Sequence, residues 1–498
     1  MNTFKRKSLY AALAGLGALG VTDAANAVDL NANGLGSALI YPYYTTRADT
    51  AGNAYNSLLS VVNSTSSAKA VKVRFLEGKN SREVLDFNLF LSGYDVWTTA
   101  IIPSASGGAK IVTNDVSCTL PPIAAGGVDF VNFAYSGSSD DKGGTSLDRT
   151  KEGYVEIIDM GNFFSDTTTF TNVTHVNGVP PGCGKVTDSQ ASSDIADFIS
   201  PGGLFGGMTL INVGSGREFT ENAVALNHFK TDGTLYFPAG DIRPQLVAAS
   251  PPVSLVVGAD LGVESNSTQT LDFSTAVYVS TWSANTADPV SAVLMAENVL
   301  NEYVLDTGTK SGTDWVVTFP TKRFYVNVGT GNAPKLFQRN FNTTAGSCDD
   351  VSLNIYDREE RTTSTPISFS PPPPTSVNSI CWEANVVTFN NSNVLASTNV
   401  ANIPTGFQNG WLNMGFPRGI SGALADVHEL INTTSTDITR LGAFGSSFQG
   451  GATVTYTGLP VVGFAVQTFN NGTLVVGGVN LLSNYGGSFP HRYVTLVQ

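Results

Sequence analysis

Hydrophobic and polar residues along the first half of the chain follow the alternating pattern of short β-strands. Val71-Lys72-Val73-Arg74-Phe75 is the clearest case, because apolar and charged side chains alternate as they do in a half-buried strand. Trp97 is expected in the core. Similar runs, separated by clusters of Ser, Thr, Gly and Asn, lie at 58–62, 70–75, 84–91, 94–102, 153–158, 208–213 and 235–237. This spacing predicts a mainly β protein of antiparallel sandwich or jelly-roll-like domains with one or two packed helices.

The pattern is interrupted at Ser250-Pro251-Pro252, which we interpret as a domain boundary. Further β-favouring runs follow at 253–257, 275–282, 351–356 and from 386 onward. We therefore predict an N-terminal β-rich domain at 28–250 and a C-terminal β-rich domain at 251–498. The chain has 498 residues, which is long enough for each domain to bury a core.

The strongest helical pattern covers 288–305. Asp288 can cap the free amides, and Pro289 occupies the first helical position, where its missing N–H costs nothing. Apolar residues then recur at three- and four-residue spacing, namely Val290, Val293, Leu294, Leu300 and Val304. Shorter helices are predicted at 422–431 and at 194–200, the latter stopped by Pro201.

Two further segments predict paired strands. Residues 314–328 are β in composition, and Pro320 divides them into two short strands or places them at a sheet edge. A hairpin is predicted over 464–476, because Asn471-Gly472 accepts the positive φ angles that a tight turn needs. Asn390-Asn391-Ser392 follows a strand with the same turn chemistry.

Residues 1–27 have the form of a secretory signal peptide. Lys5, Arg6 and Lys7 precede an apolar segment at 9–21, and Ala25-Asn26-Ala27 has the small-x-small form of a signal-peptidase site. The apolar segment is too short for a permanent membrane anchor. We therefore expect an exported protein at the cell surface, outside the cell or in the periplasm.

The charge balance excludes two classes of partner. Loss of three basic residues and one acidic residue with the signal peptide changes 27 bases and 40 acids to 24 and 39, a net charge of −15. Such an acidic chain does not bind nucleic acid by neutralising phosphates, and it has no basic patch for anionic lipids. No later run of 18 apolar residues occurs, so no membrane span is expected.

The four cysteines predict disulfides, because an even number in an exported chain without C-x-x-C spacing is typical of a disulfide framework. Three pairings are open. We favour Cys118–Cys183 and Cys348–Cys381, since each pair then lies within one predicted domain.

No catalytic signature is found, and we expect a protein without enzymatic activity and without a bound cofactor. His428-Glu429 begins the zinc motif H-E-x-x-H, but Asn432 stands where the second histidine is required. The chain has neither a G-x-S-x-G elbow nor a phosphate-binding loop. A solvated helix face is the favoured interpretation of His428.

Calcium is the one metal ion for which the sequence suggests a binding site. Asp29, Asn31 and Asn33, followed by Gly34, match the opening D-x-N-x-N-G of a calcium loop. Position twelve is Ile40 rather than the bidentate Glu, so the loop is incomplete. The alternative, which is favoured, is that these residues form a mobile polar segment at the mature N-terminus and not a calcium site. Weaker acidic candidates are Asp140-Asp141 with Asp148, and Asp349-Asp350.

Two segments resemble other exported proteins. Leu39-Ile-Tyr-Pro-Tyr-Tyr-Thr45 and Thr313-Asp-Trp-Val-Val-Thr-Phe-Pro-Thr-Lys322 resemble segments of largely uncharacterised, Sec-exported cell-surface proteins of Gram-negative bacteria. The resemblance covers these segments and the strands beside them. It implies residence at the cell surface or outside the cell, and it carries no catalytic residues.

Three functional hypotheses follow. The first is a structural or interaction protein, such as a surface-layer, sheath or matrix subunit, because low charge, many polar residues and β edges suit self-assembly. The second is an adhesin or a protein that binds cell-surface polysaccharide through exposed aromatic residues, with Tyr41, Tyr43, Tyr44 and Trp411 as candidates. The third is a secreted hydrolase that uses paired acids such as Glu359-Glu360. Adjacent strand residues point to opposite faces, which argues against that pair.

Overall fold

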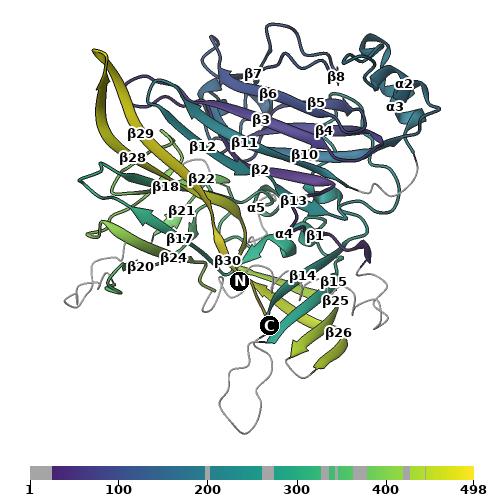
Figure 1. Ribbon diagram of the computed structural model, residues 1–498. Coiled ribbons are helices and arrows are strands. Elements are labelled where there is room, and N and C mark those ends of the chain that lie inside the picture. The colour runs from purple at the N-terminus through teal and green to yellow at the C-terminus, as the bar shows by residue number, and fades with distance from the viewer. Residues whose placement is uncertain are drawn as a thin grey trace.

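The protein is mainly β, as predicted, and is built of several antiparallel sheets (Figure 1). The computed structural model describes residues 25–196, 202–260, 274–326, 336–341, 346–362, 378–418, 427–442 and 445–498. Its α-helices are short: α2 (Thr168–Val173), α3 (Asp188–Asp194), α4 (Asp288–Leu294) and α5 (Arg323–Val326). The 3₁₀ helices are η2 (Phe133–Tyr135), η3 (Gly137–Ser139), η4 (Leu147–Lys151), η5 (Cys183–Lys185) and η6 (Leu246–Ala248).

The first half of the chain forms a sandwich of two sheets. The seven-stranded sheet has the order β1-β13-β2-β10-β4-β5-β8, with β1 (Asp29–Leu30), β2 (Ala38–Thr45), β4 (Ala68–Glu77), β5 (Glu83–Leu91), β8 (Cys118–Leu120), β10 (Glu152–Phe163) and β13 (Val224–Asn227). The six-stranded sheet has the order β12-β11-β3-β6-β7-β9, with β3 (Asn56–Asn63), β6 (Val96–Pro103), β7 (Ala109–Val112), β9 (Val128–Asp129), β11 (Leu204–Asn212) and β12 (Arg217–Asn222). Trp97 is fully buried between them, with its ring 5.6 Å from Phe87, which confirms its predicted place in the core.

The second half forms smaller sheets. One contains β23 (Val400–Ile403), β22 (Ala384–Phe389), β18 (Gly312–Thr318), β28 (Val462–Val476) and β29 (Val479–Pro490), in that order. A second contains β20 (Ser352–Asp357), β24 (Asn409–Gly415), β17 (Asn298–Val304) and β30 (Arg492–Val494). Five strands close on themselves: β14 (Val253–Asp260), β15 (Ser274–Thr281), β25 (Glu429–Gly442), β26 (Gly445–Thr457) and β31 (Leu496–Val497). Two-stranded ribbons pair β16 (Met295–Ala296) with β27 (Leu459–Pro460), and β19 (Asp349–Asp350) with β21 (Ser379–Ile380).

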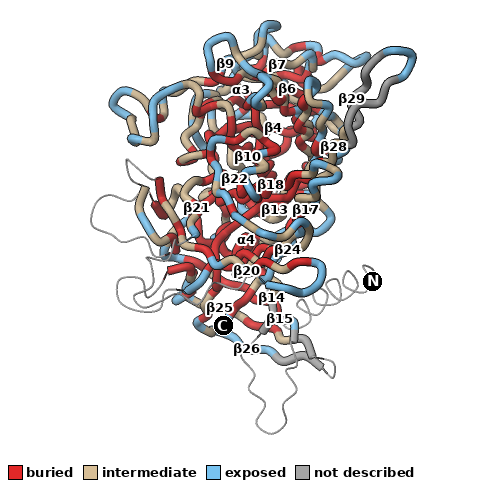
Figure 2. The backbone as a smooth tube through the Cα atoms, turned by 90° about the vertical axis from the view of Figure 1, so that its left-hand side faces the viewer, coloured by how far each residue is buried: buried red, intermediate tan, exposed pale blue. Residues whose placement is uncertain are grey.

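The sheets respect the predicted boundary near Ser250, but the apolar cores do not. Each sheet takes its strands from one side of that residue. One apolar cluster nevertheless packs Leu39 and Tyr41 of β2 with Val316 of β18 and Val466 of β28. Every residue of α4 is buried (Figure 2). The two halves therefore share continuous cores, and the division at 250 stays a prediction about folding units.

Strand β4 is buried on both faces, whereas its alternating sequence predicts one solvated face. Lys72 and Arg74 are both fully buried. The Lys72 ammonium lies 3.1 Å from Asp86 and donates to the carbonyl oxygens of Pro238 and Asp241, so a later segment of the chain covers this face. Buried charges persist only when they are paired, and here every charge on the strand has a partner. The apolar residues of this alternating strand therefore pack in the apolar core, whereas its charged residues form buried ion pairs.

The helix predicted at 288–305 is wrong beyond Leu294. Only Asp288–Leu294 is helical, with Pro289 in the first turn as expected. Met295 turns extended, and Asn298–Val304 becomes β17, paired with both β24 and β30. Short apolar runs suit helix and strand equally well, and the two neighbouring strands supply backbone partners that a longer helix would leave unpaired.

The hairpin predicted at 464–476 exists in a longer form with a different turn. Strand β28 continues through Asn470-Asn471-Gly472, where the pairing with β29 only shifts register. The chain reverses instead at Gly477-Gly478, where both residues have positive φ. Moving the turn six residues further along the chain is favoured because each added residue pair contributes backbone hydrogen bonds. After β22, Asn390 and Asn391 do adopt positive φ, but the next strand, β23, runs parallel to β22.

Three smaller predictions are corrected. The helix expected at 194–200 lies earlier, as α3, with Thr187 capping it, and 197–200 lie outside the described residues. Of the helix expected at 422–431, residues 422–426 lie outside the described residues, and Glu429 already belongs to strand β25. Residues 235–237 form no strand; they cross the seven-stranded sheet, where Asn88 donates to the carbonyl of Phe237.

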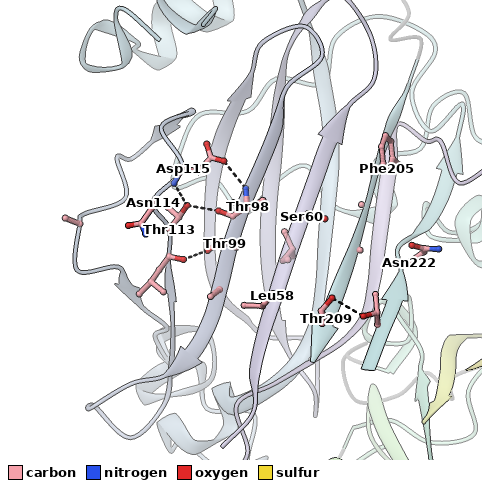
Figure 3. A pocket seen from close by; sticks show the side chains of 17 residues that line it. Leu58, Ser60, Thr98, Thr99, Thr113, Asn114, Asp115, Phe205, Thr209 and Asn222 are labelled. Carbon is pink, nitrogen blue, oxygen red and sulfur yellow. Dashed lines mark hydrogen bonds between the residues drawn. The ribbon is translucent and has the colours of Figure 1, made fainter. Parts of the chain in front are cut away.

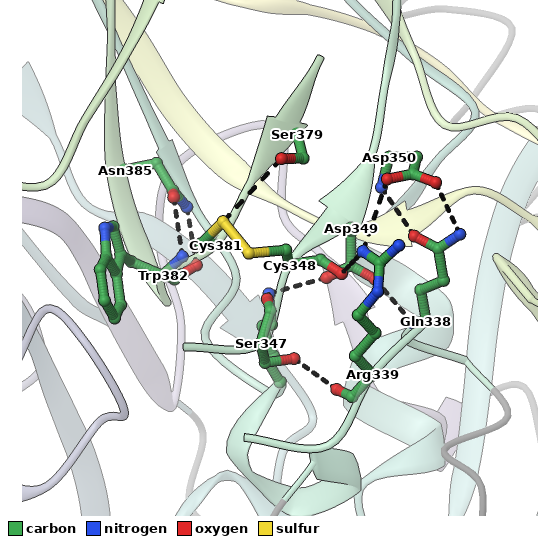
Figure 4. Close-up of a disulfide and its surroundings, with 11 residues drawn as sticks. Gln338, Arg339, Ser347, Cys348, Asp349, Asp350, Ser379, Cys381, Trp382 and Asn385 are labelled. Atoms are coloured by element: carbon green, nitrogen blue, oxygen red, sulfur yellow. Dashed lines mark hydrogen bonds and ion pairs between the residues drawn. A yellow bond between two sulfur atoms is a disulfide. The ribbon is translucent and has the colours of Figure 1, made fainter. Parts of the chain in front are cut away.

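Both predicted disulfides are confirmed: Cys118 bonds to Cys183, and Cys348 bonds to Cys381 (Figure 4). Two disulfides indicate an oxidising compartment outside the cytoplasm. Across the described ranges, none of the helices has the length and apolar character that crossing a bilayer requires. Most of the predicted signal peptide, 1–24, lies outside these ranges.

Candidate functional site

A groove of about 890 Å³ lies on the outer face of the six-stranded sheet (Figure 3). It crosses β6, β3 and β11, whose opposite face packs in the sandwich core. The side chains that line it alternate along each strand with buried core residues, as the two-residue period of a strand requires. The core therefore holds the lining residues on a rigid support.

The floor of the groove is made of small residues. Gly207 of β11 pairs with Ser60 of β3, and Ser60 pairs with Thr98 of β6, so these three form one row across the sheet. In the next row Leu58 pairs with Ala100. Because Gly207 has no side chain, the face is hollowed between its bulkier neighbours.

Larger side chains form the two walls. Phe205 and Asn222 stand on one side, and Asn114 lies on the other, in the loop after β7 (Figure 3). This loop is fixed by Asp115, which accepts hydrogen bonds from the backbone amides of Thr98 at 3.1 Å and Ser117 at 2.9 Å. The Cys118–Cys183 disulfide holds the chain directly after it.

The lining is polar but almost uncharged. Thr209 and Thr220 hydroxyls lie 3.1 Å apart, and the Thr113 hydroxyl donates to the carbonyl of Thr98 at 2.6 Å. A hydroxyl that donates one hydrogen bond still has acceptor capacity for a ligand. Among the described residues that line the groove, Asp115 is the single charged one. Two apolar side chains are left exposed, Phe205 at 42% and Leu58 at 40%.

The residues predicted to bind calcium lie apart from this groove. The carboxylate of Asp29 contacts His228 Nδ1 at 2.8 Å, and the Asn31 side-chain oxygen accepts the backbone amide of Asn33 at 2.9 Å. The Asp29 contact joins β1 to the residue after β13, and the Asn31 contact belongs to the polar turn that follows β1. Within the described ranges, no cluster of three or more His, Cys, Asp or Glu is placed to hold a metal. Calcium at Asp29, Asn31 and Asn33 stays a prediction.

The other acidic candidates have basic partners. Asp141 lies 2.7 Å from the Arg149 guanidinium, and Asp148 bonds to Arg47 and Lys151. Asp349 contacts Lys322 at 2.7 Å and His428 at 3.4 Å beside the second disulfide (Figure 4).

His428 is buried in a turn rather than exposed on a helix, which corrects the sequence interpretation. Glu359 and Glu360 lie in an exposed turn after β20, where Glu359 pairs with Arg358. They do not face each other across a cleft, so this pair gives no support to a hydrolase.

The aromatic candidates separate into two groups. Tyr41, Tyr43 and Tyr44 are fully buried in β2, so they cannot form a surface platform, and the prediction for them is wrong. Strand β2 has sheet neighbours along both edges and also contacts β11 and β18. Trp411 is 38% exposed and stacks on Tyr356, with ring centroids 4.5 Å apart.

Segments 39–45 and 313–322 meet in the core. Thr318 of β18 donates its hydroxyl hydrogen to the carbonyl of Pro42 in β2 at 2.7 Å. Val316, from the same segment, packs in the cluster that contains Tyr41. These two segments therefore join the two halves of the molecule and do not line the groove.

Comparison of the chain with protein-family models, with curated proteins and with solved structures finds no match. The groove is therefore the feature of the molecule from which a function can be inferred.

Proposed function

We propose that this is an exported interaction protein of the cell surface or extracellular space that binds a neutral polysaccharide along the groove. The observation that supports it is the combination of an open, almost uncharged, hydroxyl-rich groove with two exposed apolar side chains. Sugar rings present C–H faces and hydroxyl edges, so they need apolar contacts and neutral hydrogen-bonding groups together.

The contacts can be assigned by chemistry. Phe205 and Leu58 stand on opposite sides of the small-residue row and meet the C–H faces of a sugar. The Asn114 and Asn222 side chains carry both donors and acceptors, which match sugar hydroxyls. A phosphate or sulfate polymer would instead need basic residues, and the described lining contains none.

The groove is tested by glycan-array binding and titration of the mature protein. Phe205→Ala should weaken binding about tenfold, because loss of an aromatic contact is worth about 1.4 kcal/mol. Ser60→Trp should abolish binding by filling the floor. The matched control is Phe133→Ala, which removes a phenyl ring that is 74% exposed outside the groove.

Two results would contradict the assignment. If the protein binds no glycan, the proposed ligand class is wrong. If Trp411→Ala abolishes binding while Phe205→Ala leaves it unchanged, the ligand lies on the Trp411–Tyr356 stack of β24 and β20 instead.

A subunit of an assembled surface layer, sheath or matrix is the second candidate. It is supported by β29, an edge strand in a projecting hairpin (Figure 1), on which Tyr485 is 61% and Phe489 is 41% exposed. Part of β29 contacts β12, and the remaining part of this edge can pair with another chain. Several other edges are short: β1 and β9 have two residues each, and β8 has three.

Electron microscopy of the purified mature protein tests assembly. We expect ordered arrays that Tyr485→Lys disperses, because a charge at an edge opposes strand pairing. Val213→Lys is the matched control, since Val213 is 77% exposed and lies in the turn after β11. Monodisperse particles at all concentrations would contradict this second candidate.

A further inference from the structure

A buried Lys, Asp and Asn lie together at one end of the N-terminal sandwich. Lys69 is on β4, and Asp159 and Asn162 are on the adjacent antiparallel strand β10. The Lys69 Nζ lies 2.7 Å from Asp159 Oδ2 and 2.9 Å from Asn162 Oδ1. The Lys69 and Asp159 side chains are 0% exposed, and Asn162 is 2% exposed.

A β-bulge brings the three side chains to one face. Residues three apart on a regular strand point to opposite faces. The register here shifts between Asp159, which pairs with Val71, and Gly161, so that Asn162 pairs with Lys69. The extra residue on β10 turns Asn162 to the side of Asp159. Gly161 has φ of 139°, which L side chains rarely adopt, so glycine suits this bulge.

Of the two polar atoms of the Asn162 side-chain amide, only the oxygen has a hydrogen-bond partner among the described residues. Its Oδ1 accepts from Lys69, while its Nδ2 has no hydrogen-bond partner among the described residues. The Asp159 carboxylate is oriented by the backbone amide of Gly161, which donates to Oδ1 at 3.0 Å. The arrangement thus contains a nucleophile, the Lys69 amine, and an acyl carbon, Cγ of Asn162, whose amide nitrogen has no hydrogen-bond partner among the described residues. It also contains a fixed carboxylate, that of Asp159, which contacts the nucleophile.

We propose that Lys69 and Asn162 are joined by an intramolecular amide bond, formed with Asp159 as the proton carrier. This modification does not depend on the proposed polysaccharide binding. It converts the hydrogen-bonded contact between β4 and β10 into a covalent link between two inner strands of the seven-stranded sheet.

The chemistry is balanced without any co-reactant. Proton transfer from the Lys69 ammonium to Asp159 gives a neutral amine and a neutral acid. The amine lone pair attacks Cγ of Asn162, and Asp159 protonates the developing oxyanion. Asp159 then moves a proton from the attacking nitrogen to Nδ2, the Cγ–Nδ2 bond breaks, and ammonia leaves with the remaining proton. One C–N bond forms, one C–N bond breaks, and nothing is oxidised or reduced.

The fold supplies what this reaction needs. Both strands hold the reacting groups in contact, which replaces an encounter in solution by an intramolecular step. Burial disfavours the ion pair that the neutral amine and acid replace. Water is excluded from the site, so the acyl carbon meets the amine rather than water.

Intact-mass measurement of the mature wild-type protein tests the proposal directly. Beyond the hydrogens lost in the two disulfides, the mass should be lower than the sequence mass by one ammonia, about 17 Da. Protease digestion should give one branched peptide that contains both Lys69 and Asn162. An unmodified mass would overturn the proposal, and a loss of one water, about 18 Da, would overturn the choice of Asn162 over Asp159 as acceptor.

Variants identify the proton carrier. Asp159→Ala keeps both linked residues and should retain the full mass of its own sequence, with separate Lys69 and Asn162 peptides. Lys72→Met is the matched control, because Lys72 is also buried on β4 and contacts Asp86 at 3.1 Å. It should keep the ammonia loss, and a variant at Asp159 that still loses ammonia would remove that residue from the mechanism.

Discussion

Replacing Glu152 with alanine is expected to lower the free energy of unfolding by about 3–5 kcal/mol, the largest loss that we predict for a single polar residue. Glu152 is the first residue of β10, and its side chain is buried. Its carboxylate accepts from the Arg47 Nε at 3.0 Å and from the Tyr43 hydroxyl at 2.9 Å. Removing it leaves the Arg47 charge buried beside groups that have lost their acceptor.

The same carboxylate joins the two halves of the chain. It accepts from the hydroxyl of Ser397 at 2.6 Å, and from the hydroxyl and backbone amide of Thr398 at 2.6 and 3.1 Å. Both residues precede β23, on the far side of the predicted boundary at 250. Loss of Glu152 should therefore weaken the contact between the halves as well as the N-terminal sandwich.

Urea denaturation followed by circular dichroism measures this effect. Glu302→Ala is the control, because Glu302 is exposed on β17 and surface substitutions change stability by about 0.5 kcal/mol or less. Glu152→Gln should fall between the two, since it keeps one acceptor but loses the charge that pairs with Arg47. Equal stability of Glu152→Ala and Glu302→Ala would show that the contact is not maintained in solution.

Glu383→Gln is expected to stabilise the protein above pH 8, by on the order of 3 kcal/mol. Glu383 is fully buried just before β22. Its Oε2 accepts from the Ser81 hydroxyl at 2.6 Å, but Oε1 has no hydrogen-bond partner within the described ranges. Burial raises the pKa of this carboxyl from 4.5 to about 8, although Ser81, Lys322 and Arg323 act in the opposite direction.

The sign of the pH dependence follows from this raised pKa. The folded protein holds a proton on Glu383 that the unfolded chain releases above pH 4.5. The resulting stabilisation is complete below about pH 4.5 and is lost as the pH rises through about 8. Glutamine is neutral at every pH, so the variant lacks this loss.

Urea midpoints measured between pH 5 and 9 test the effect. The difference between Glu383→Gln and the wild type should grow from pH 5 to about pH 8 and then level off. Glu152→Gln is the control for a buried Glu whose carboxylate is fully hydrogen-bonded, and it should destabilise throughout. A constant difference for Glu383→Gln across the window would contradict the raised pKa.

The class of fold, and the local features that depend on residues close together in the chain, can be predicted from the sequence alone. The predicted strands at 58–62, 84–91 and 253–257 lie within β3, β5 and β14. The alternating period identifies such strands without reference to their partners. The cysteine pairs were also predictable, because pairing within each half was the simplest division of four residues.

The conformation of a segment depends on the three-dimensional fold wherever its partner is distant in the chain. Residues 298–304 are a strand because β24 and β30 lie beside them, and the hairpin turns at Gly477-Gly478 because β29 extends the pairing past Asn471. Lys72 is buried because the segment 236–241 covers its face of β4, and Arg74 is buried beside the carboxylate of Glu83. In each case the deciding hydrogen bonds or charges come from elsewhere in the sequence.

The groove and the buried cluster of Lys69, Asp159 and Asn162 likewise depend on contacts between strands that are distant in the chain. Ser60, Thr98 and Gly207 lie on strands that were each predicted, but their row exists only because β3 lies between β6 and β11. Lys69 and Asn162 are 93 residues apart, and a single bulge at Gly161 brings Asp159 to their side. Local patterning specifies which residues form strands, whereas strand order and register specify which side chains meet.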